Sequence, residues 1–349
     1  MGQTLRRRQI GRTQLHVSEL GLGAASLGNL YSVVSDEEAR ATLVAARAAG
    51  ITYVDTAPFY GLGLSERRVG DALRGSPNMV VSTKVGRLLR PAADVIDDRE
   101  RWGFRSSMPF APEYDYTFDG ILQSWQASLQ RLGLAHIDML YVHDIGKVTH
   151  GSSHTEQFRE LTEGGGLRAL LKLRSDGAIS AVGIGVNEIA VCLDVLREFD
   201  LDAVLLAGRY SLLEQDPLDE LFPQCAIRGT SIVIGGPYNS GILATGTRSG
   251  PTHYNYERPS DSIIERVRRI ELICDRYDVP LAAAALQFPL AHPQVASVIP
   301  GVGRASRVVQ TVQLYRFAIP EEFWAELKDT GLIRSDAPTP PQRLQYAAS

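Results

Sequence analysis

The sequence predicts an α/β fold, a (β/α)8 TIM barrel with an N-terminal β-hairpin and a C-terminal extension. Short apolar runs of strand length alternate along the chain with longer amphipathic segments, a pattern typical of βαβ units and a parallel sheet. The length of 349 residues suits one such barrel. Polar turn residues within residues 9–20 indicate a hairpin that closes the barrel floor. Eight strands are expected, at Leu20–Gly23, Ile51–Asp55, Met79–Lys84, Ile137–Val142, Ala181–Gly185, Ala203–Leu206, Ser231–Ile234 and Ala296–Ile299.

Amphipathic helices are expected between these strands, and the first of them has clear end signals. Ser35 and Glu38 have the spacing of a capping box, in which the serine hydroxyl accepts a hydrogen bond from the third helical amide. Gly50 stands where a helix commonly ends on a left-handed glycine. The helices with the strongest pattern are expected at Asp36–Ala49, Gly120–Arg131, Glu188–Phe199 and Ser262–Asp278.

We expect one domain over residues 1–335 and a proline-containing tail over residues 336–349, which carries Pro338, Pro340 and Pro341. The longest irregular stretch is expected at Arg87–Thr117, directly after a barrel strand. Long loops in compact domains are usually functional or disordered. This one is expected to form a wall of the substrate site because it is rich in aromatic residues, namely Trp102, Phe104, Phe110, Tyr114 and Tyr116.

Composition and charge exclude several classes of function. The chain has 36 basic and 40 acidic residues, so its net charge of -4 does not favour nucleic acid or an anionic membrane. An apolar leader and long apolar runs are both missing, which disfavours secretion and membrane spanning. Its three cysteines, Cys192, Cys225 and Cys274, form no CxxC pair and fit a reducing compartment, so we expect a cytoplasmic location. His150 and His154 lack a third ligand, and no metal site is expected.

Three polar residues follow apolar strands at their carboxyl ends, where a barrel places its catalytic groups. Asp55, Lys84 and His143 end the second, third and fourth expected strands, and Tyr60 follows Asp55 on the next loop. Each has an ordinary structural explanation by itself: the aspartate caps a helix, the lysine faces solvent and the histidine is satisfied in the core. Their occurrence on successive strands favours one shared site.

Together these groups suit acid–base chemistry on a carbonyl or alcohol. A lysine ammonium about 4 Å away stabilises tyrosinate by roughly 4 kcal/mol at an effective dielectric constant of about 20. We therefore expect Lys84, held by Asp55, to lower the pKa of Tyr60 from its ordinary value of about 10. Tyr60 would then transfer the proton and His143 would orient the substrate oxygen. None of the four is a hydride source, so an external cofactor is implied.

The chain resembles the aldo-keto reductase family over about residues 5–330. The motifs that carry this resemblance are GRT at residues 11–13, VSELGLG at 17–23, VDTAPFYG at 54–61 with Ser65 and Glu66 after it, STKVG at 82–86 and IDMLYVH at 137–143. The resemblance implies a barrel with a catalytic tetrad of Asp55, Tyr60, Lys84 and His143, using NAD or NADP. Three further runs resemble the bacterial sugar-oxidising branch: GIGVNE at 183–188, LAGRYSLLEQ at 206–215 and GPYNSGIL at 236–243.

The resemblance also assigns a cofactor site. PGVGRASR at residues 300–307 follows the last strand, where the family binds the adenosine end, and Arg307 falls where an arginine meets the 2′-phosphate or the adenine. Taken without the resemblance, this run is equally an ordinary turn. The chain departs from the family in having Gly301 for a frequent lysine, Ala207 for a glutamine and Gly235 for an aromatic residue. The expected cofactor contacts are Asn187 (carboxamide), Gly236, Tyr238, Ser240, Gly241, Gly301, Gly303, Arg304 and Arg307.

We expect an enzyme that transfers hydride between a nicotinamide and a small polar substrate, with aldose oxidation at C1 as the first candidate. The resembling branch includes L-fucose and D-threo-aldose 1-dehydrogenases, and pyridoxal 4-dehydrogenase is similar. Pyridoxal oxidation and general aldehyde or ketone reduction are the alternatives. A non-catalytic, NADP-binding regulatory subunit is a further alternative, which the complete tetrad disfavours. The sequence leaves the substrate, the direction, the choice of NAD or NADP and the oligomeric state open.

Overall fold

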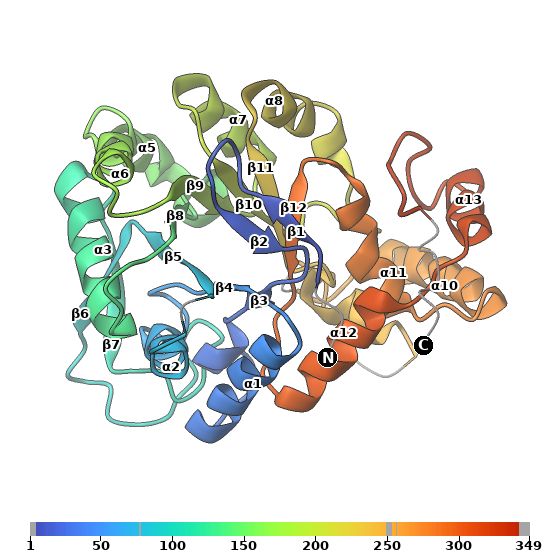
Figure 1. The fold of residues 1–349 in the computed structure, drawn as a ribbon, viewed down its shortest axis with the longest axis horizontal. Coiled ribbons are helices and arrows are strands. Elements are labelled where there is room, and N and C mark those ends of the chain that lie inside the picture. The colour runs from blue at the N-terminus through green and yellow to red at the C-terminus, as the bar shows by residue number, and fades with distance from the viewer. Residues whose placement is uncertain (1–4, 77, 249–252, 256, 342–349) are drawn as a thin grey trace.

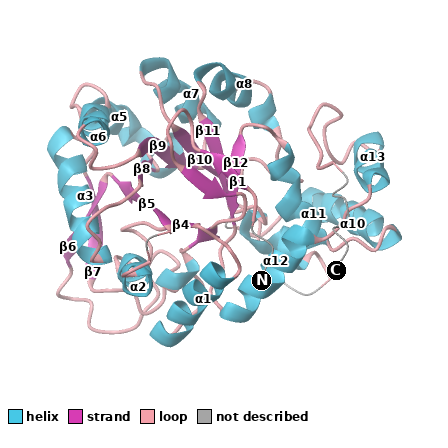
Figure 2. Cartoon of the chain, in the orientation of Figure 1, coloured by secondary structure: helices cyan, strands magenta, loops and turns pink. Residues whose placement is uncertain are grey.

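The computed structural model describes residues 5–76, 78–248, 253–255 and 257–341, and it shows the expected barrel (Figures 1 and 2). Eight parallel strands pair in the order β12-β11-β10-β9-β8-β5-β4-β3. All eight expected strands are confirmed with small shifts at their ends. Their bounds are β3 (Leu22–Gly23), β4 (Tyr53–Asp55), β5 (Val80–Val85), β8 (Met139–His143), β9 (Ala181–Val186), β10 (Ala203–Ala207), β11 (Ser231–Gly235) and β12 (Val295–Ile299).

The ring closes between the first and the last strand through main-chain contacts. The amide of Gly21 donates to the carbonyl of Val298 at 2.9 Å, and the amide of Gly23 donates to that of Pro300 at 3.0 Å. A Cβ atom on Gly21 would lie 2.7 Å from the Ile299 side chain, and one on Gly23 would lie 2.9 Å from the Ile299 carbonyl. Glycine at both positions therefore lets the two ends of the sheet approach each other.

Helices surround the barrel, and the four expected ones are confirmed as α1 (Asp36–Ala48), α3 (Phe118–Leu132), α7 (Ile189–Glu198) and α10 (Asp261–Arg276). The Ser35 hydroxyl accepts from the Glu38 amide at 3.1 Å, as expected, while the Glu38 carboxylate lies 3.7 Å from Arg304. Gly50 has the expected positive φ of 87°. The other helices are α2 (Leu64–Leu73), α4 (Lys147–His150), α5 (His154–Leu161), α6 (Gly166–Ser175), α8 (Leu221–Arg228), α9 (Ile242–Thr245), α11 (Leu281–Gln287), α12 (Ala305–Arg316) and α13 (Glu321–Asp329).

The expected hairpin of β1 (Arg7–Gln9) and β2 (His16–Ser18) covers one end of the barrel. Its turn needs a glycine at position 11, because φ there is 53° and a Cβ atom would lie 2.6 Å from the Asp202 carbonyl. Ile10 and Val17 are fully buried and belong to the cluster inside the barrel, with Tyr53 and Met139 among its members. A separate, larger cluster fills the space between the strands and the helices.

The stretch expected to be irregular, Arg87–Thr117, is partly a second hairpin. β6 (Arg87–Pro91) pairs with β7 (Phe110–Tyr114) in antiparallel register. Prolines at positions 91 and 112 lie within these strands, and proline is tolerated there because each strand is the edge of a two-stranded ribbon. That proline content concealed the hairpin in the sequence.

The expected tail begins at residue 336, and residues 342–349 lie outside the described residues. Its first residues are anchored: Ala337 is buried, and the Arg334 guanidinium bridges Asp336 at 2.8 Å and Asp219 at 2.5 Å. Within the part of the chain that the structure describes, every helix is too short or too polar to cross a bilayer.

Packing of the hairpin inside the barrel generates a stability prediction. Ile10→Ala should lower the free energy of unfolding by about 2–5 kcal/mol, because it leaves a cavity in a fully buried cluster. Ile227→Ala is the matched control, since that side chain is 72% exposed on α8, and its effect should stay within about 0.5 kcal/mol. Urea denaturation measures both, and equal midpoints for the two variants would show that the hairpin does not contribute to the core.

Candidate active site

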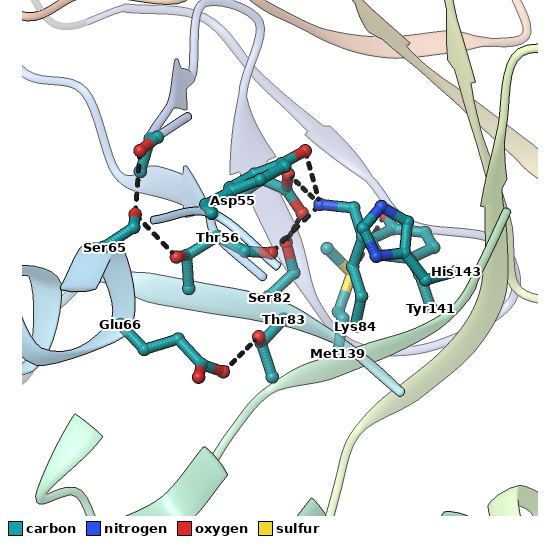
Figure 3. A network of polar contacts seen from close by, with 12 residues as sticks. Asp55, Thr56, Ser65, Glu66, Ser82, Thr83, Lys84, Met139, Tyr141 and His143 are labelled. Carbon is teal, nitrogen blue, oxygen red and sulfur yellow. Dashed lines mark hydrogen bonds and ion pairs between the residues drawn. The ribbon is translucent and has the colours of Figure 1, made fainter. Parts of the chain in front are cut away.

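The four residues expected to form a tetrad come together: Figure 3 shows Asp55, Lys84 and His143 on neighbouring strands, and Tyr60 reaches Lys84 from the loop after β4. Asp55 ends β4, His143 ends β8, and Lys84 lies near the end of β5 between them. Lys84 Nζ is 2.6 Å from Asp55 Oδ2 and 3.1 Å from the Tyr60 hydroxyl. The rings of Tyr60 and His143 meet edge to face with centroids 6.1 Å apart. The four residues thus form one compact cluster, as their spacing in the sequence predicts.

A buried network holds Asp55 from below, and the sequence reasoning missed it. Ser82 donates to Asp55 Oδ1 at 2.7 Å, and its hydroxyl lies 3.0 Å from that of Tyr53. The Tyr53 hydroxyl in turn lies 3.3 Å from that of Tyr141. Ser82 and Tyr53 each stand two residues before a cluster member, so strand periodicity places them on the same face. Polar residues at alternate strand positions were the signal that could have identified them.

The ion pair of Lys84 and Asp55 sets the charge of the cluster. Both side chains are buried, and burial alone disfavours charge on either. Burial lowers the pKa of Lys84, but the Asp55 carboxylate and the Tyr60 hydroxyl together raise it above its ordinary value. Lys84 also donates to the Thr56 carbonyl at 2.9 Å. The ammonium group is therefore stabilised as a fixed positive charge against the Tyr60 oxygen.

The expected direction of the Tyr60 pKa is wrong for the cofactor-free chain. Burial raises the pKa of Tyr60 above its ordinary value, and although Lys84 opposes this, the charge of Asp55 adds to it. The expected decrease in the Tyr60 pKa included the attraction of Lys84 but not the free-energy cost of placing a tyrosinate in a buried site. Tyr60 is consequently a phenol at neutral pH, ready to donate a proton and in need of activation to accept one.

His143 is a neutral imidazole. Burial, with the nearby charges of Arg87 and Lys84, holds the pKa of His143 well below its ordinary value. Its Nε2 lies 3.4 Å from Asp144 Oδ2, while its Nδ1 is buried without a hydrogen-bond partner in the described part of the chain. The backbone carbonyl of His143 accepts from the Tyr116 hydroxyl at 2.7 Å, which fixes the strand end.

A cavity of about 470 Å³ opens over the cluster, and Tyr60, Lys84 and His143 line it. Trp102 and Phe104 of the β6–β7 connection also line it, so this segment forms a wall, as expected. Phe110, Tyr114 and Tyr116 lie outside the lining, and Tyr116 supports His143 instead. The remaining lining residues are Ala25, Leu30, Tyr31, Phe59, Gly103, Asp144, Gly185, Val186, Asn187, Leu205 and Ala207. Aromatic walls above a polar floor suit a small ring-shaped molecule.

Of the expected cofactor contacts, Asn187 is the one that lines this cavity. The others follow β11 (Gly236, Tyr238, Ser240, Gly241) and β12 (Gly301, Gly303, Arg304, Arg307), which are neighbours in the sheet. Burial raises the pKa of Tyr238, and the positive charge of Arg307 partly offsets this effect, so the two side chains interact electrostatically. These two loops lie outside the described cavity lining and after neighbouring strands.

The loop after β12 fits the phosphate and adenosine end of a dinucleotide. A Cβ atom on Gly303 would lie 3.3 Å from Ser26 and from Val34, so glycine keeps the loop close to the first βα connection. α12 begins after Arg304 without a side-chain cap on its amides, and amides at a helix start attract anions. The exposed guanidinium groups of Arg304 and Arg307 add positive charge there.

Arg209 is a further residue of this region that the sequence reasoning missed. Its Nε donates to the Asn187 carbonyl at 2.7 Å, and its Nη1 donates to Asn255 at 2.7 Å. Ala207 of β10 pairs with Gly235 of β11, so the two expected departures from the family lie next to each other in the sheet. Arg209 lies two residues after β10, so a charged residue after a strand end was again the available signal.

Comparison with known proteins now identifies the family. Residues 19–331 match the model of the aldo/keto reductase family. The chain is 46% identical to pyridoxal 4-dehydrogenase of Microbacterium luteolum, over 94% of this chain and 98% of that protein. It is 41% identical to D-threo-aldose 1-dehydrogenase of a Pseudomonas species, over 93% and 96% of the two chains.

The chain belongs to the aldo/keto reductase family.

A solved structure supports the same assignment. The holo form of aldo-keto reductase AKR11C1 from Bacillus halodurans superposes with a TM-score of 0.70 at 26% identity, covering 98% of this chain and 99% of that one. As a member of this family the chain is an oxidoreductase that uses NAD or NADP. The barrel, the cavity and the polar cluster at its floor are therefore features of an enzyme of this class.

The first prediction from the site concerns the proton-transfer group. Tyr60→Phe removes the hydroxyl that contacts Lys84 and keeps the ring, so kcat should fall by about 10²–10⁴-fold, the usual contribution of a general acid–base group. Cofactor affinity, measured by quenching of protein fluorescence, should stay near the wild-type value. Retention of more than about a tenth of the activity would contradict the assignment of Tyr60 as the acid–base residue.

The second prediction concerns pH. Because the pKa of Tyr60 is raised, oxidation, which needs tyrosinate, should speed up from about pH 7 to about pH 10, whereas reduction, which needs the phenol, should stay nearly level. Lys84→Met deletes the charge that lowers the Tyr60 pKa and should move the oxidation profile to still higher pH. Initial rates in both directions test this, with circular dichroism to establish folding. An unmoved profile in a folded variant would rule out the coupling.

Proposed function

We propose that this chain is an NAD(P)-linked dehydrogenase of cyclic hemiacetals, the ring forms of hydroxyaldehydes such as aldoses and pyridoxal. The observation that carries the proposal is the Tyr60 hydroxyl, held 3.1 Å from Lys84 at the floor of an aromatic-walled cavity. Relatives that are 46% and 41% identical are named for oxidation of pyridoxal and of an aldose at C1. Both substrates can close a hydroxyl onto their own aldehyde, so one chemical form unites the two.

The chemistry favours the ring form. Oxidation by hydride loss requires a carbon that bears both a hydrogen and a hydroxyl. A free aldehyde lacks the hydroxyl, whereas a cyclic hemiacetal has it. Loss of the carbon-bound hydrogen as hydride and of the hydroxyl hydrogen as a proton leaves a carbon–oxygen double bond, and the product is a lactone. The acid–base group in the cavity has to accept one proton for each turnover.

The residues of the cluster divide this work. Tyr60 takes the hydroxyl proton, and the fixed charge of Lys84 stabilises the tyrosinate that does so. Asp55 keeps Lys84 charged and aimed. His143, as a neutral imidazole, donates a hydrogen bond to the reacting oxygen and orients it. The bound nicotinamide supplies the hydride acceptor.

We assign the cofactor to the continuous region from the cavity to α12. Asn187 lies in the cavity and is the candidate for the carboxamide contact. Gly301, Gly303, Arg304 and Arg307 would hold the phosphates and the adenosine, and the loop after β11 would cover them through Gly236, Tyr238, Ser240 and Gly241. One catalytic domain over residues 1–335 is part of this proposal, and the family match over residues 19–331 supports it.

Pyridoxal is the second candidate substrate, and the aromatic walls favour it. Tyr31, Phe59, Trp102 and Phe104 line the cavity and offer faces on which a flat ring can stack. A non-catalytic regulatory role has less support, because the polar cluster is complete and faces an open cavity. The cytoplasmic location stays a prediction, with the free, buried cysteines as its support.

Matched pairs of substrates test the proposal. 5-Hydroxypentanal closes to tetrahydropyran-2-ol and should be oxidised, whereas pentanal cannot close and should not be. Pyridoxal should likewise be preferred over pyridoxal 5′-phosphate, whose ring-closing oxygen is blocked. NAD(P)H absorbance with both cofactors gives the rates, and mass spectrometry identifies the product. Oxidation of pentanal at a similar rate, or release of a carboxylic acid in place of a lactone, would refute the hemiacetal proposal.

A further inference from the structure

A second carboxylate, that of Asp144, lines the catalytic cavity beside His143. Its Oδ2 lies 3.4 Å from His143 Nε2 and contacts Arg87 Nη2. The Asp144 side chain is 26% exposed, whereas that of Arg87 is buried. The proton-transfer cluster of Tyr60, Lys84 and Asp55 makes no hydrogen bond to this pair among the described residues, so acid–base catalysis does not account for it.

Arg87 holds Asp144 in a fixed position. The Arg87 guanidinium lies over the Phe59 ring at 4.3 Å and over the Tyr114 ring at 5.3 Å, so it is enclosed on both sides. Asp144 itself has a φ of 47°, and its amide donates to the Gly185 carbonyl at 2.9 Å. Residues held in this left-handed conformation cluster at functional sites, where the surrounding structure fixes them. The carboxylate therefore faces the cavity in one defined orientation.

Only one of the two carboxylate oxygens is used by the protein. Among the described residues, the Asp144 side chain makes its polar contacts, to Arg87 and to His143, through Oδ2. Within the described residues, Oδ1 makes no hydrogen bond to the protein. A carboxylate oxygen on a cavity wall is a strong hydrogen-bond acceptor, and hydroxyl groups are its natural donors.

A purely stabilising role explains the pair less well. Buried ion pairs are weak contributors to stability, because desolvation offsets the attraction between the charges. The same β6–β7 hairpin carries another arginine–carboxylate pair, Arg90 with Glu113 at 2.9 Å, which is half-exposed and lies outside the cavity lining. Position on the cavity wall is what distinguishes the Asp144 pair from the Arg90 pair.

We propose that Asp144, fixed by Arg87, accepts a hydrogen bond from a substrate hydroxyl on the carbon next to the one that is oxidised. This inference rests on the proposed function and narrows it to α-hydroxylated hemiacetals. We place the reacting oxygen between the Tyr60 hydroxyl and His143 Nε2, and the carboxylate of Asp144 reaches within 3.4 Å of that nitrogen through Oδ2. Hydroxyl oxygens on adjacent carbons are about one hydrogen-bond length, roughly 3 Å, apart. In an aldose this second hydroxyl is the one at C2.

The test compares two probes that differ by that hydroxyl alone: tetrahydropyran-2-ol and its 3-hydroxy derivative. The wild-type enzyme should prefer the 3-hydroxy probe in kcat/KM by about tenfold or more, because tetrahydropyran-2-ol leaves the second oxygen of the Asp144 carboxylate without a hydrogen-bond donor. In Asp144→Asn this ratio should fall toward one, mainly through a higher KM for the hydroxylated probe. Glu113→Gln makes the same chemical change in the Arg90 pair and should keep the wild-type ratio.

Each outcome decides the matter. Oxidation of neither probe by the wild type refutes the proposed function, and this inference with it. Equal kcat/KM for the two probes in the wild type refutes the inference alone, and that comparison stands even if Asp144→Asn does not fold. An equal loss on both probes in Asp144→Asn, carried by kcat, would show that Asp144 acts only by positioning His143.

Discussion

The ion pair of Lys84 and Asp55 is the interaction on which the rest of the site depends. A lysine buried at a strand end is tolerable only with a carboxylate beside it, and that carboxylate needs its own donors. Ser82, on the same strand face as Lys84, supplies one of them and connects the pair to Tyr53 and Tyr141 inside the barrel. The packed interior is thus polar at the level just below the cavity and apolar beneath it, where Ile10 and Val17 enter. The charged cluster and the apolar packing of the barrel interior are therefore adjacent layers, joined through Ser82 and Tyr53.

Charge in the cavity is arranged so that each group has one function. Burial, and after it the charges of Arg87 and Lys84, depress the pKa of His143, which leaves the imidazole neutral and therefore a hydrogen-bond donor without net charge. Each cation has its own carboxylate, Asp55 or Asp144, so the two pairs stay separate on either side of the reacting position. The aromatic rings of Phe59 and Tyr114 pack against the Arg87 guanidinium, which is buried, whereas Asp144 stays partly exposed in the cavity.

The sequence was sufficient for the strands and for the four polar residues, because apolar runs of fixed length ending in Asp55, Lys84 and His143 are local signals. It was insufficient where the outcome depends on several segments at once. The β6–β7 hairpin carries prolines that argue against a strand until the edge position of both is known. The direction of the Tyr60 pKa depends on burial, which a spacing argument does not contain. Asp144 and Arg87 stand beside residues that were singled out, but their pairing joins the start of β6 to the residue after β8, and only the folded barrel brings these together.

The glycine-lined seam between the first and last strands also bears on how the molecule is made. Gly21 and Gly23 bond to residues near position 300, so the ring stays open until almost the whole chain has left the ribosome. Until then the hairpin of residues 7–18 has no finished cylinder to enter, and the edge of the first strand is unpaired. Such long-range closure slows folding and prolongs the exposure of an open sheet edge. Closure of the barrel therefore waits for its last strand, and removal of residues 295–300 would take away the acceptors that join the two ends of the sheet.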